Sequence, residues 1–228
     1  MVDFTFKTKP YAHQLSALEA SCDSESFALL MDMGTGKSKV LIDTITHLDK
    51  KDLINSVLIF APKGVYKNWV EKEIPAHLPD EVKYKLAYWA SPLTNKHKDA
   101  IRSIWKVDDN LHIFVMNIEA LSSGKAEEVA TKFIKSHGGR TLVVIDESTV
   151  IKNHKARRTK AAIRLAKLCA YKRILTGSPI TKTPLDLFAQ FQFLGEKKRE
   201  KFDCHATAKT GNKIRHHNNM GHVRRTGT

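Results

Sequence analysis

The sequence predicts a doubly wound α/β fold, in which a mostly parallel sheet carries helices on both faces. Short apolar runs rich in β-branched residues alternate with helical patterns over residues 11–194. Most of these runs are continuously apolar, as expected of parallel strands that are covered on both faces. Such alternation implies right-handed crossover connections, and ligands of these sheets bind beyond the carboxyl ends of the strands.

The expected helices and strands follow one another in regular order from an initial helix. Strands are predicted at SFALLM (26–31), SVLIFA (56–61), VKYKLAYW (82–89), LHIFVMN (111–117), TLVVID (141–146) and KRILTG (172–177). Helical patterns lie before and between them at 11–21, 37–49, 65–75, 96–107, 124–137, 155–168 and 184–194. No internal repeat is visible, so residues 1–195 are expected to form one domain.

The composition is that of an ordinary soluble chain of 228 residues, with 42% hydrophobic and 27% charged residues. No stretch approaches the roughly 20 apolar residues of a membrane span, and the first residues, MVDFTFKTKP, have no apolar signal core. We therefore expect no membrane association and no secretion, but a cytoplasmic protein. The cysteines, Cys22, Cys169 and Cys204, are far apart, which predicts reduced thiols and no disulfide.

A net charge of +14 predicts a polyanionic partner, because lysines and arginines that neutralise phosphates release counterions. The alternative is a generally basic surface that opposes aggregation. Residues 196–228 hold nine Lys or Arg against three Asp or Glu and show no periodicity, which predicts a basic, disordered tail. Its potential zinc ligands lack the usual paired spacing, so no zinc site is expected. They are Cys204, His205, His216, His217 and His222.

The segment LLMDMGTGKSKVLID (29–43) predicts a phosphate-binding loop between a strand and a helix. Free N–H groups at a helix start suit an anion, and Gly34 and Gly36 let the backbone approach a phosphate closely. Lys37 would reach the β- and γ-phosphates of ATP, and Ser38 would offer its hydroxyl to Mg²⁺. The usual spacing requires glycine at position 31, where this chain has methionine. A glycine turn that merely caps a helix is therefore the alternative.

A second motif supports a nucleotide site, because TLVVIDEST (141–149) brings two adjacent carboxylates to the end of an apolar strand. There Asp146 would hold Mg²⁺, and Glu147 would accept a proton from the attacking water. Solvated acids at a strand end are the alternative for this segment alone. Together, on strands of one sheet, the two motifs predict the core of a nucleoside triphosphatase.

Several segments also resemble, in order, the motifs of the Swi/Snf-like branch of the superfamily-two helicases and translocases. They are PYAHQLSALE (10–19), MDMGTGKS (31–38), VLIFAPKGVYKNWVEKE (57–73), FVMNIEAL (114–121), VVIDESTVIKN (143–153) and LTGSPITKTPLDLFAQFQFL (175–194). The last two are the most specific, since they are close to the family's D-E-A-H-x-I-K-N and L-T-G-T-P-I patterns. The third resembles a motif with N-W-x-x-E after the strand. The family's phosphate loop commonly reads D-E-M-G-L-G-K-T, which accounts for methionine at position 31.

The resemblance implies the first of two RecA-like lobes, with ATP and Mg²⁺ in the cleft between the lobes and double-stranded DNA lying across both. Gln14 would read adenine, and Lys37 and Glu147 would be the catalytic residues. The predicted ATP-binding residues are Gln14, Met33, Gly34, Thr35, Gly36, Lys37 and Ser38, and the predicted metal ligands are Ser38 and Asp146. The residues expected to couple hydrolysis to motion are Thr149, Thr176 and Ser178.

The resemblance also predicts DNA contacts at Lys63, Lys67, Asn68 and Lys152, and with them an association with DNA in the nucleoid or nucleus. A solvated helix start is the alternative for the first three, and a brace within the loop is the alternative for Lys152. Trp69 is expected to pack in the core rather than to stack on a base, because translocases of this type grip the DNA backbone.

Two departures from the family pattern bear on activity. Thr149 replaces the histidine usual in the acidic motif, which concerns coupling and not metal binding. No motif of the second lobe, whose arginines complete the ATP site, is recognisable, and Arg224 and Arg225 lie in the aperiodic tail. The main hypothesis is a DNA-dependent ATPase whose second lobe is on another chain or missing.

Two other hypotheses remain open. The first is a module that binds ATP and DNA with negligible hydrolysis of its own. The second is a small-molecule kinase that uses the same loop, but it leaves the I-K-N and L-T-G-S-P segments without a role.

Overall fold

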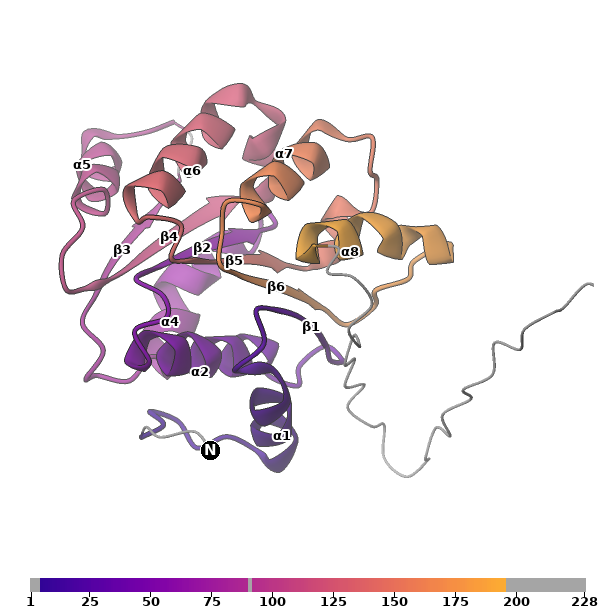
Figure 1. Cartoon of the computed structure of the whole chain (residues 1–228), viewed down its shortest axis with the longest axis horizontal. Helices are drawn as coiled ribbons and strands as arrows, with labels where there is room; N and C mark the ends of the chain where they lie inside the picture. The colour runs from indigo at the N-terminus through magenta and orange to yellow at the C-terminus, as the bar shows by residue number, and fades with distance from the viewer. Residues whose placement is uncertain (1–4, 90–91, 196–228) are drawn as a thin grey trace, which may run out of the picture.

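The structure is a computed structural model of the chain and describes residues 5–89 and 92–195 (Figure 1). These residues form one six-stranded sheet in the order β1-β6-β5-β2-β4-β3, and all neighbouring strands are parallel. The strands are β1 (Ser26–Leu30), β2 (Ser56–Ala61), β3 (Tyr84–Tyr88), β4 (Leu111–Asn117), β5 (Thr141–Asp146) and β6 (Tyr171–Thr176). Each lies within two residues of its predicted range, so the parallel α/β sheet is confirmed.

Helices cover both faces of the sheet (Figure 1). Along β2, Val57, Ile59 and Ala61 point into one apolar core, and Leu58 and Phe60 into the other. The first core includes side chains of α1 (Ala12–Ser21), α2 (Lys37–Lys50) and the helical segment 66–77. The second includes side chains of α6 (Gly124–Ser136), α7 (Arg157–Ala166) and α8 (Phe188–Leu194), with α5 (Asn95–Ser103) beside them. Because each central strand faces two cores, its sequence is a continuous apolar run.

The order of the strands decides which loops meet at the carboxyl edge of the sheet. β6 lies between β1 and β5, so the segment after β6 lies between the phosphate-loop segment and the acidic pair. Leu30 at the end of β1 pairs with Thr176, and Asp146 at the end of β5 pairs with Leu175. On its other side, β5 borders β2. Four of the segments singled out in the sequence are therefore gathered at one place.

The helical segment predicted at 65–75 is confirmed over residues 66–77, but it is not a regular α-helix throughout. α3 (Tyr66–Asn68) leads into a π-helical turn (Trp69–Glu73) and then into α4 (Ile74–His77). In this turn the amide of Ile74 donates to the carbonyl of Trp69. Pro75 explains the wider turn, because proline has no N–H and its ring would clash with the carbonyl four residues earlier in a regular helix.

The π turn also accommodates a departure from the N-W-x-x-E spacing. After Trp69 the sequence reads V-E-K-E, which places lysine at the expected position and Glu73 one residue later. The wider turn takes up this extra residue. The side chain of Glu73 consequently lies beside Asn68, whose Nδ2 donates to Glu73 Oε1 at 2.9 Å.

Other helices differ from their predicted ranges at their ends. α5 stops at Ser103 rather than at 107, and beyond it the side chain of Asp108 accepts from the backbone of Asn110 in a turn. α7 begins at Arg157 rather than at 155. The segment 184–194 starts as a 3₁₀ turn, η4 (Pro184–Leu187), before α8.

Within the described part of the chain, no helix has the length and apolar content that crossing a membrane requires. Cys22 and Cys169 are buried free thiols. The predicted tail, with Cys204 and its histidines, lies outside the described residues. The domain boundary at 195 therefore stays a prediction.

Candidate active site

The loop between β1 and α2 has the backbone conformation that its glycines predict. Gly34 has a φ of 77° and Gly36 a φ of 83°, both in the left-handed region that favours glycine. Gly36 is also the N-cap of α2. A Cβ at Gly36 would lie 2.2 Å from Nε2 of Gln14, so a side chain there would force Gln14 to move. The loop thus presents bare backbone at the start of a 14-residue helix, as an anion site requires.

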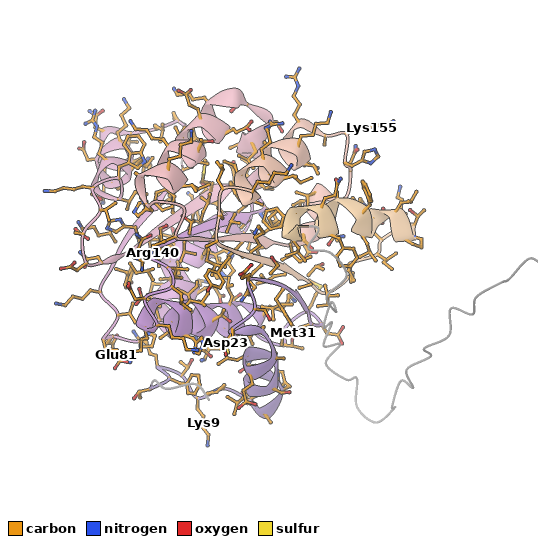
Figure 2. All side chains as sticks on the ribbon, in the orientation of Figure 1. Lys9, Asp23, Met31, Glu81, Arg140 and Lys155 are labelled. Carbon is orange, nitrogen blue, oxygen red and sulfur yellow. The ribbon has the colours of Figure 1, made fainter. Side chains whose placement is uncertain are left out.

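Met31 belongs to the core and not to the phosphate cradle. Its side chain is 2% exposed, while its backbone carbonyl accepts a 3.0 Å hydrogen bond from Lys37 Nζ. The Lys37 ammonium also donates to the carbonyl of Asp32 at 3.1 Å. Figure 2 shows Met31 and Asp23 on the α1–α2 side of the sheet and Lys155 on the loop before α7. Glycine is not needed at position 31, because the tight turn begins only after Asp32.

Gln14 braces the phosphate loop from α1. Its Nε2 donates to the carbonyl of Thr35 at 3.0 Å, and its Oε1 accepts from the backbone N–H of Tyr11 at 2.9 Å. The ring of His13 contacts the same carbonyl of Thr35 through Nε2 at 3.0 Å. Gln14 is buried, with 6% of its surface exposed. The structure therefore places Gln14 against the loop, whereas its reading of adenine stays a prediction.

Asp146 ends β5 in a half-buried position. The indole Nε1 of Trp69 donates to its Oδ2 at 2.8 Å. Burial raises the pKa of Asp146; the Trp69 bond opposes this rise, the charge of Glu147 adds to it, and the Lys37 ammonium opposes it. A carboxylate oxygen is a ligand that Mg²⁺ prefers, so Asp146 is suited to hold the predicted cation. Sequence reasoning assigned Trp69 to the core, which its 1% exposure bears out, but it missed this polar contact.

Glu147 has an unusual backbone conformation, and two threonines bind its side chain. Its φ is 55°, which is uncommon for a residue with a side chain. Thr149 Oγ1 donates to Glu147 Oε1 at 3.1 Å, and Thr176 Oγ1 donates to the same oxygen at 2.7 Å. The backbone N–H of Ser178 in turn donates to Thr176 Oγ1 at 3.2 Å. Two of the predicted coupling residues thus contact the predicted base, and Ser178 contacts one of them; their role in coupling stays a prediction.

A second link between the acidic motif and the segment after β6 was not predicted. The buried hydroxyl of Ser148 donates to Gln190 Oε1 at 2.5 Å. Gln190 Nε2 donates to the carbonyls of Pro179 and Asp186 at 2.9 and 2.8 Å. A glutamine among the apolar residues of FAQFQFL was the available signal, since a buried amide needs partners.

The predicted DNA-contact residues lie along the carboxyl edge of the sheet but differ in whether their side chains already have hydrogen-bond partners. Lys63 and Lys67 are exposed after β2. Asn68 is engaged by Glu73, and Lys152 Nζ donates to Thr181 Oγ1 at 2.6 Å. Contact with DNA stays a prediction for all four, and the two exposed lysines are the freest to make it.

Oxygen ligands for a magnesium ion are available beside the phosphate loop. Ser38 lies in the first turn of α2, and Asp146 is the last residue of β5, which is separated from β1 by β6. A hydroxyl and a carboxylate are donors that Mg²⁺ prefers, so these residues fit the predicted cation.

The described residues also contain a group of Cys22, Asp23 and His47, whose ligand atoms lie within 4.8 Å of one another. Lys51 Nζ donates to Asp23 at 2.7 Å, and with His47 it lowers the pKa of that carboxyl to about 2, which identifies an ion-pair cluster.

Comparison with known proteins gives a consistent result. The family model of the SNF2-related domain matches residues 13–220. The chromatin-remodeling ATPase INO80 of Pyricularia oryzae is 27% identical over 169 residues, which cover 72% of this chain and 8% of that protein. The SNF2 domain-containing protein ENL1 of Oryza sativa is 25% identical over 208 residues, covering 84% of this chain and 20% of that protein. The chain therefore spans at most a fifth of the length of these relatives.

Two solved structures share the fold. The SWI2/SNF2 ATPase core of Sulfolobus solfataricus, solved in complex with double-stranded DNA, has a TM-score of 0.65 and 22% identity, covering 86% of this chain and 37% of that chain. The UvsW helicase of bacteriophage T4 has a TM-score of 0.57 and 14% identity, covering 82% of this chain and 58% of that chain. These likenesses confirm the predicted RecA-like fold.

Proposed function

Because the chain belongs to the family of SNF2-related domains, we propose that it is the ATP-binding and hydrolysing lobe of a helicase-type ATPase that acts on double-stranded DNA. One observation carries the proposal: Thr149 and Thr176 both donate to Oε1 of Glu147, next to Asp146. This arrangement holds Oε1 and leaves Oε2 as the oxygen that can accept a proton from water. A general base so placed, across β6 from a phosphate loop, suits hydrolysis of a phosphate anhydride.

Each remaining residue has a role that follows from its position. The amides at the start of α2 and the Lys37 ammonium would balance the charge of the phosphates, with Lys37 exchanging two carbonyl partners for phosphate oxygens. Ser38 and Asp146 would hold Mg²⁺, which when bound neutralises charge on the phosphates. Gln14 would keep the phosphate loop in its conformation, and α1 would border the adenine of ATP.

Double-stranded DNA is the proposed partner, for reasons of charge and position. The chain carries a net charge of +14. Lys63 and Lys67 follow β2, and Lys152 follows the neighbouring β5, so all three belong to one edge of the sheet. Contacts of lysines with DNA phosphates fix position without reading sequence. We therefore expect the protein in the compartment that holds DNA, with a second lobe contributed by another chain or by a longer protein.

The test is steady-state ATP hydrolysis with and without duplex DNA, for the native chain and for Glu147→Gln. Glu128→Gln, an exposed acid on α6, is the matched control. We expect DNA-stimulated hydrolysis that Glu147→Gln abolishes and Glu128→Gln leaves intact, with ATP binding retained in both variants. Hydrolysis that survives Glu147→Gln would refute the assignment of the base.

The second candidate is a module that binds ATP and DNA but hydrolyses negligibly alone. Two observations favour it. The described residues form a single sheet, which is one lobe, and the chain covers only 37% of the Sulfolobus core. In helicase-type ATPases the arginines of a second lobe complete the site, and loss of such an arginine costs about 10³- to 10⁵-fold in rate. Binding of both ligands without turnover in the native chain would select this candidate.

A further inference from the structure

Trp69 connects the π-helical turn after β2 to the end of β5. Its indole N–H donates to Asp146 Oδ2 at 2.8 Å, across 77 positions of sequence. Trp69 is 1% exposed, so its indole is shielded from water, whereas Asp146 at the other end of the bond is half-buried. β2 and β5 are paired neighbours, which places the two residues on adjacent segments of the carboxyl edge.

The chemistry of the contact is directional. A buried indole N–H requires an acceptor, and a backbone carbonyl would meet that requirement as well as a carboxylate does. The indole is a donor only, so the oxygen that faces it must accept. Oδ2 of Asp146 is therefore the acceptor, and the bond restricts the rotation of the carboxylate, whose remaining lone pairs can face a cation.

The local backbone is built to deliver the indole. Trp69 is the first residue of the π turn, and its carbonyl accepts from the amide of Ile74. The bond between Asn68 Nδ2 and Glu73 Oε1 spans the same turn at 2.9 Å. π turns of this kind occur often at functional sites, where they reorient one side chain.

We propose that Trp69 is a positioning residue for magnesium-dependent nucleotide binding, which it supports by orienting the carboxylate of Asp146. This inference rests on the proposed function, because it requires Asp146 to be the magnesium ligand. Residues that orient metal ligands through a hydrogen bond change metal affinity about 10- to 100-fold when they are replaced.

The first test examines the hydrogen bond itself in the nucleotide-free protein. The chain has three tryptophans, Trp69, Trp89 and Trp105, and the test records their indole ¹H–¹⁵N signals by NMR. Asp146→Asn replaces a charged acceptor by a neutral one, so the Trp69 signal should move and the other two should stay. An unchanged Trp69 signal, identified by its loss in Trp69→Phe, would overturn the proposal.

The second test separates orientation of Asp146 from packing of the ring. ATP affinity is measured with Mg²⁺ and with excess EDTA for the native chain, Trp69→Phe and Trp105→Phe. Trp105 is a matched control, because its Nε1 has no hydrogen-bond partner within the described residues. We expect Trp69→Phe to reduce the gain in affinity that Mg²⁺ provides by about 10-fold and to leave affinity in EDTA unchanged. Equal losses under both conditions would indicate packing alone and would overturn the proposal.

A second variant covers the case in which Trp69→Phe fails to fold. Replacement of Trp69 by benzothienylalanine keeps the bicyclic shape and removes the N–H, so the same loss of the magnesium-dependent gain is expected. Full retention of that gain would overturn the proposal. Asp146→Asn distinguishes failure of the proposed function from failure of the inference about Trp69. If it leaves the magnesium-dependent gain in affinity intact, the assignment of the metal ligand in the proposed function fails. If Asp146→Asn removes the gain and neither Trp69 variant does, only the role of Trp69 fails.

Discussion

The hydroxyl of Thr176 donates a 2.7 Å hydrogen bond to Oε1 of Glu147 and so joins the end of β6 to the residue after β5. Glu147 has a φ of 55°, and such a conformation costs a residue with a side chain on the order of 1–3 kcal/mol. The bond thus holds a strained residue at the point where the proposed base must stand. Thr149 adds a second donor to the same oxygen, although it stands where the family has histidine.

Thr176→Val should reduce ATP hydrolysis while leaving ATP affinity within about twofold of the native value. A hydrogen bond to a charged group contributes about 1.5–3 kcal/mol, so the turnover number should fall about 10- to 100-fold. Thr131→Val on α6, outside the site, is the control and should retain native turnover. Native turnover in Thr176→Val would show that the bond does not orient the base.

Gly36→Ala should damage the phosphate loop more than Gly34→Ala does. Both residues have left-handed backbones, which cost an L-residue about 1–2 kcal/mol, but only a Cβ at Gly36 meets a neighbour, Gln14 Nε2 at 2.2 Å. Gly64→Ala is the control, because a Cβ there has nothing within 4 Å and the backbone is not left-handed. The order of loss in ATP affinity and in Tm should therefore be Gly36, Gly34, Gly64. An equal effect at all three glycines would contradict the loop geometry.

Asp49→Asn should stabilise the chain at pH 7 and lose that advantage in acid. Burial and the nearby charge of Asp52 raise the pKa of Asp49 to about 6, above its usual value of 3.8. The folded state then binds more protons than the unfolded state between these values, so native stability falls as pH rises through this window.

The gain for Asp49→Asn at pH 7 should be about 1 kcal/mol, or about 2–4 °C in Tm for a chain of this size. It should disappear as pH falls from about 6 to below 4, which thermal unfolding at several pH values measures. Asp43 also has a raised pKa, of about 6, but it is present in both proteins and cancels in the difference. A gain that is independent of pH would contradict the assignment to Asp49.

The double variant Lys63→Ala, Lys67→Ala should weaken binding of duplex DNA and make that binding less sensitive to salt. Each lysine that neutralises a phosphate contributes about 0.9 to the slope of log affinity against log salt, so the slope should decrease in magnitude by about 2. Lys96→Ala on α5 provides an exposed lysine of a different segment as control. An unchanged slope in the double variant would place the DNA contact elsewhere.

The strands and the phosphate loop were predictable because their signals are local. An apolar run such as SVLIFA needs two covered faces wherever it lies, and Gly34 and Gly36 adopt backbones that other residues avoid. The π turn was not predicted, although Pro75 was a visible signal, because a helical pattern over 65–75 does not reveal how its hydrogen bonds shift. The extra residue before Glu73 was the second signal.

By itself, the sequence determined the α/β class, the order of the elements and the residue types at the carboxyl edge. Only the tertiary structure decided which of those residues touch. The indole of Trp69 reaches Asp146 across 77 positions, and Ser148 reaches Gln190 across 42, because the order β1-β6-β5-β2 brings their segments together. Apolar burial depends little on which apolar group is contacted, so it can be predicted from the pattern of apolar residues in the sequence. A hydrogen bond requires one donor and one acceptor at a definite distance. That requirement is met only once the chain has folded.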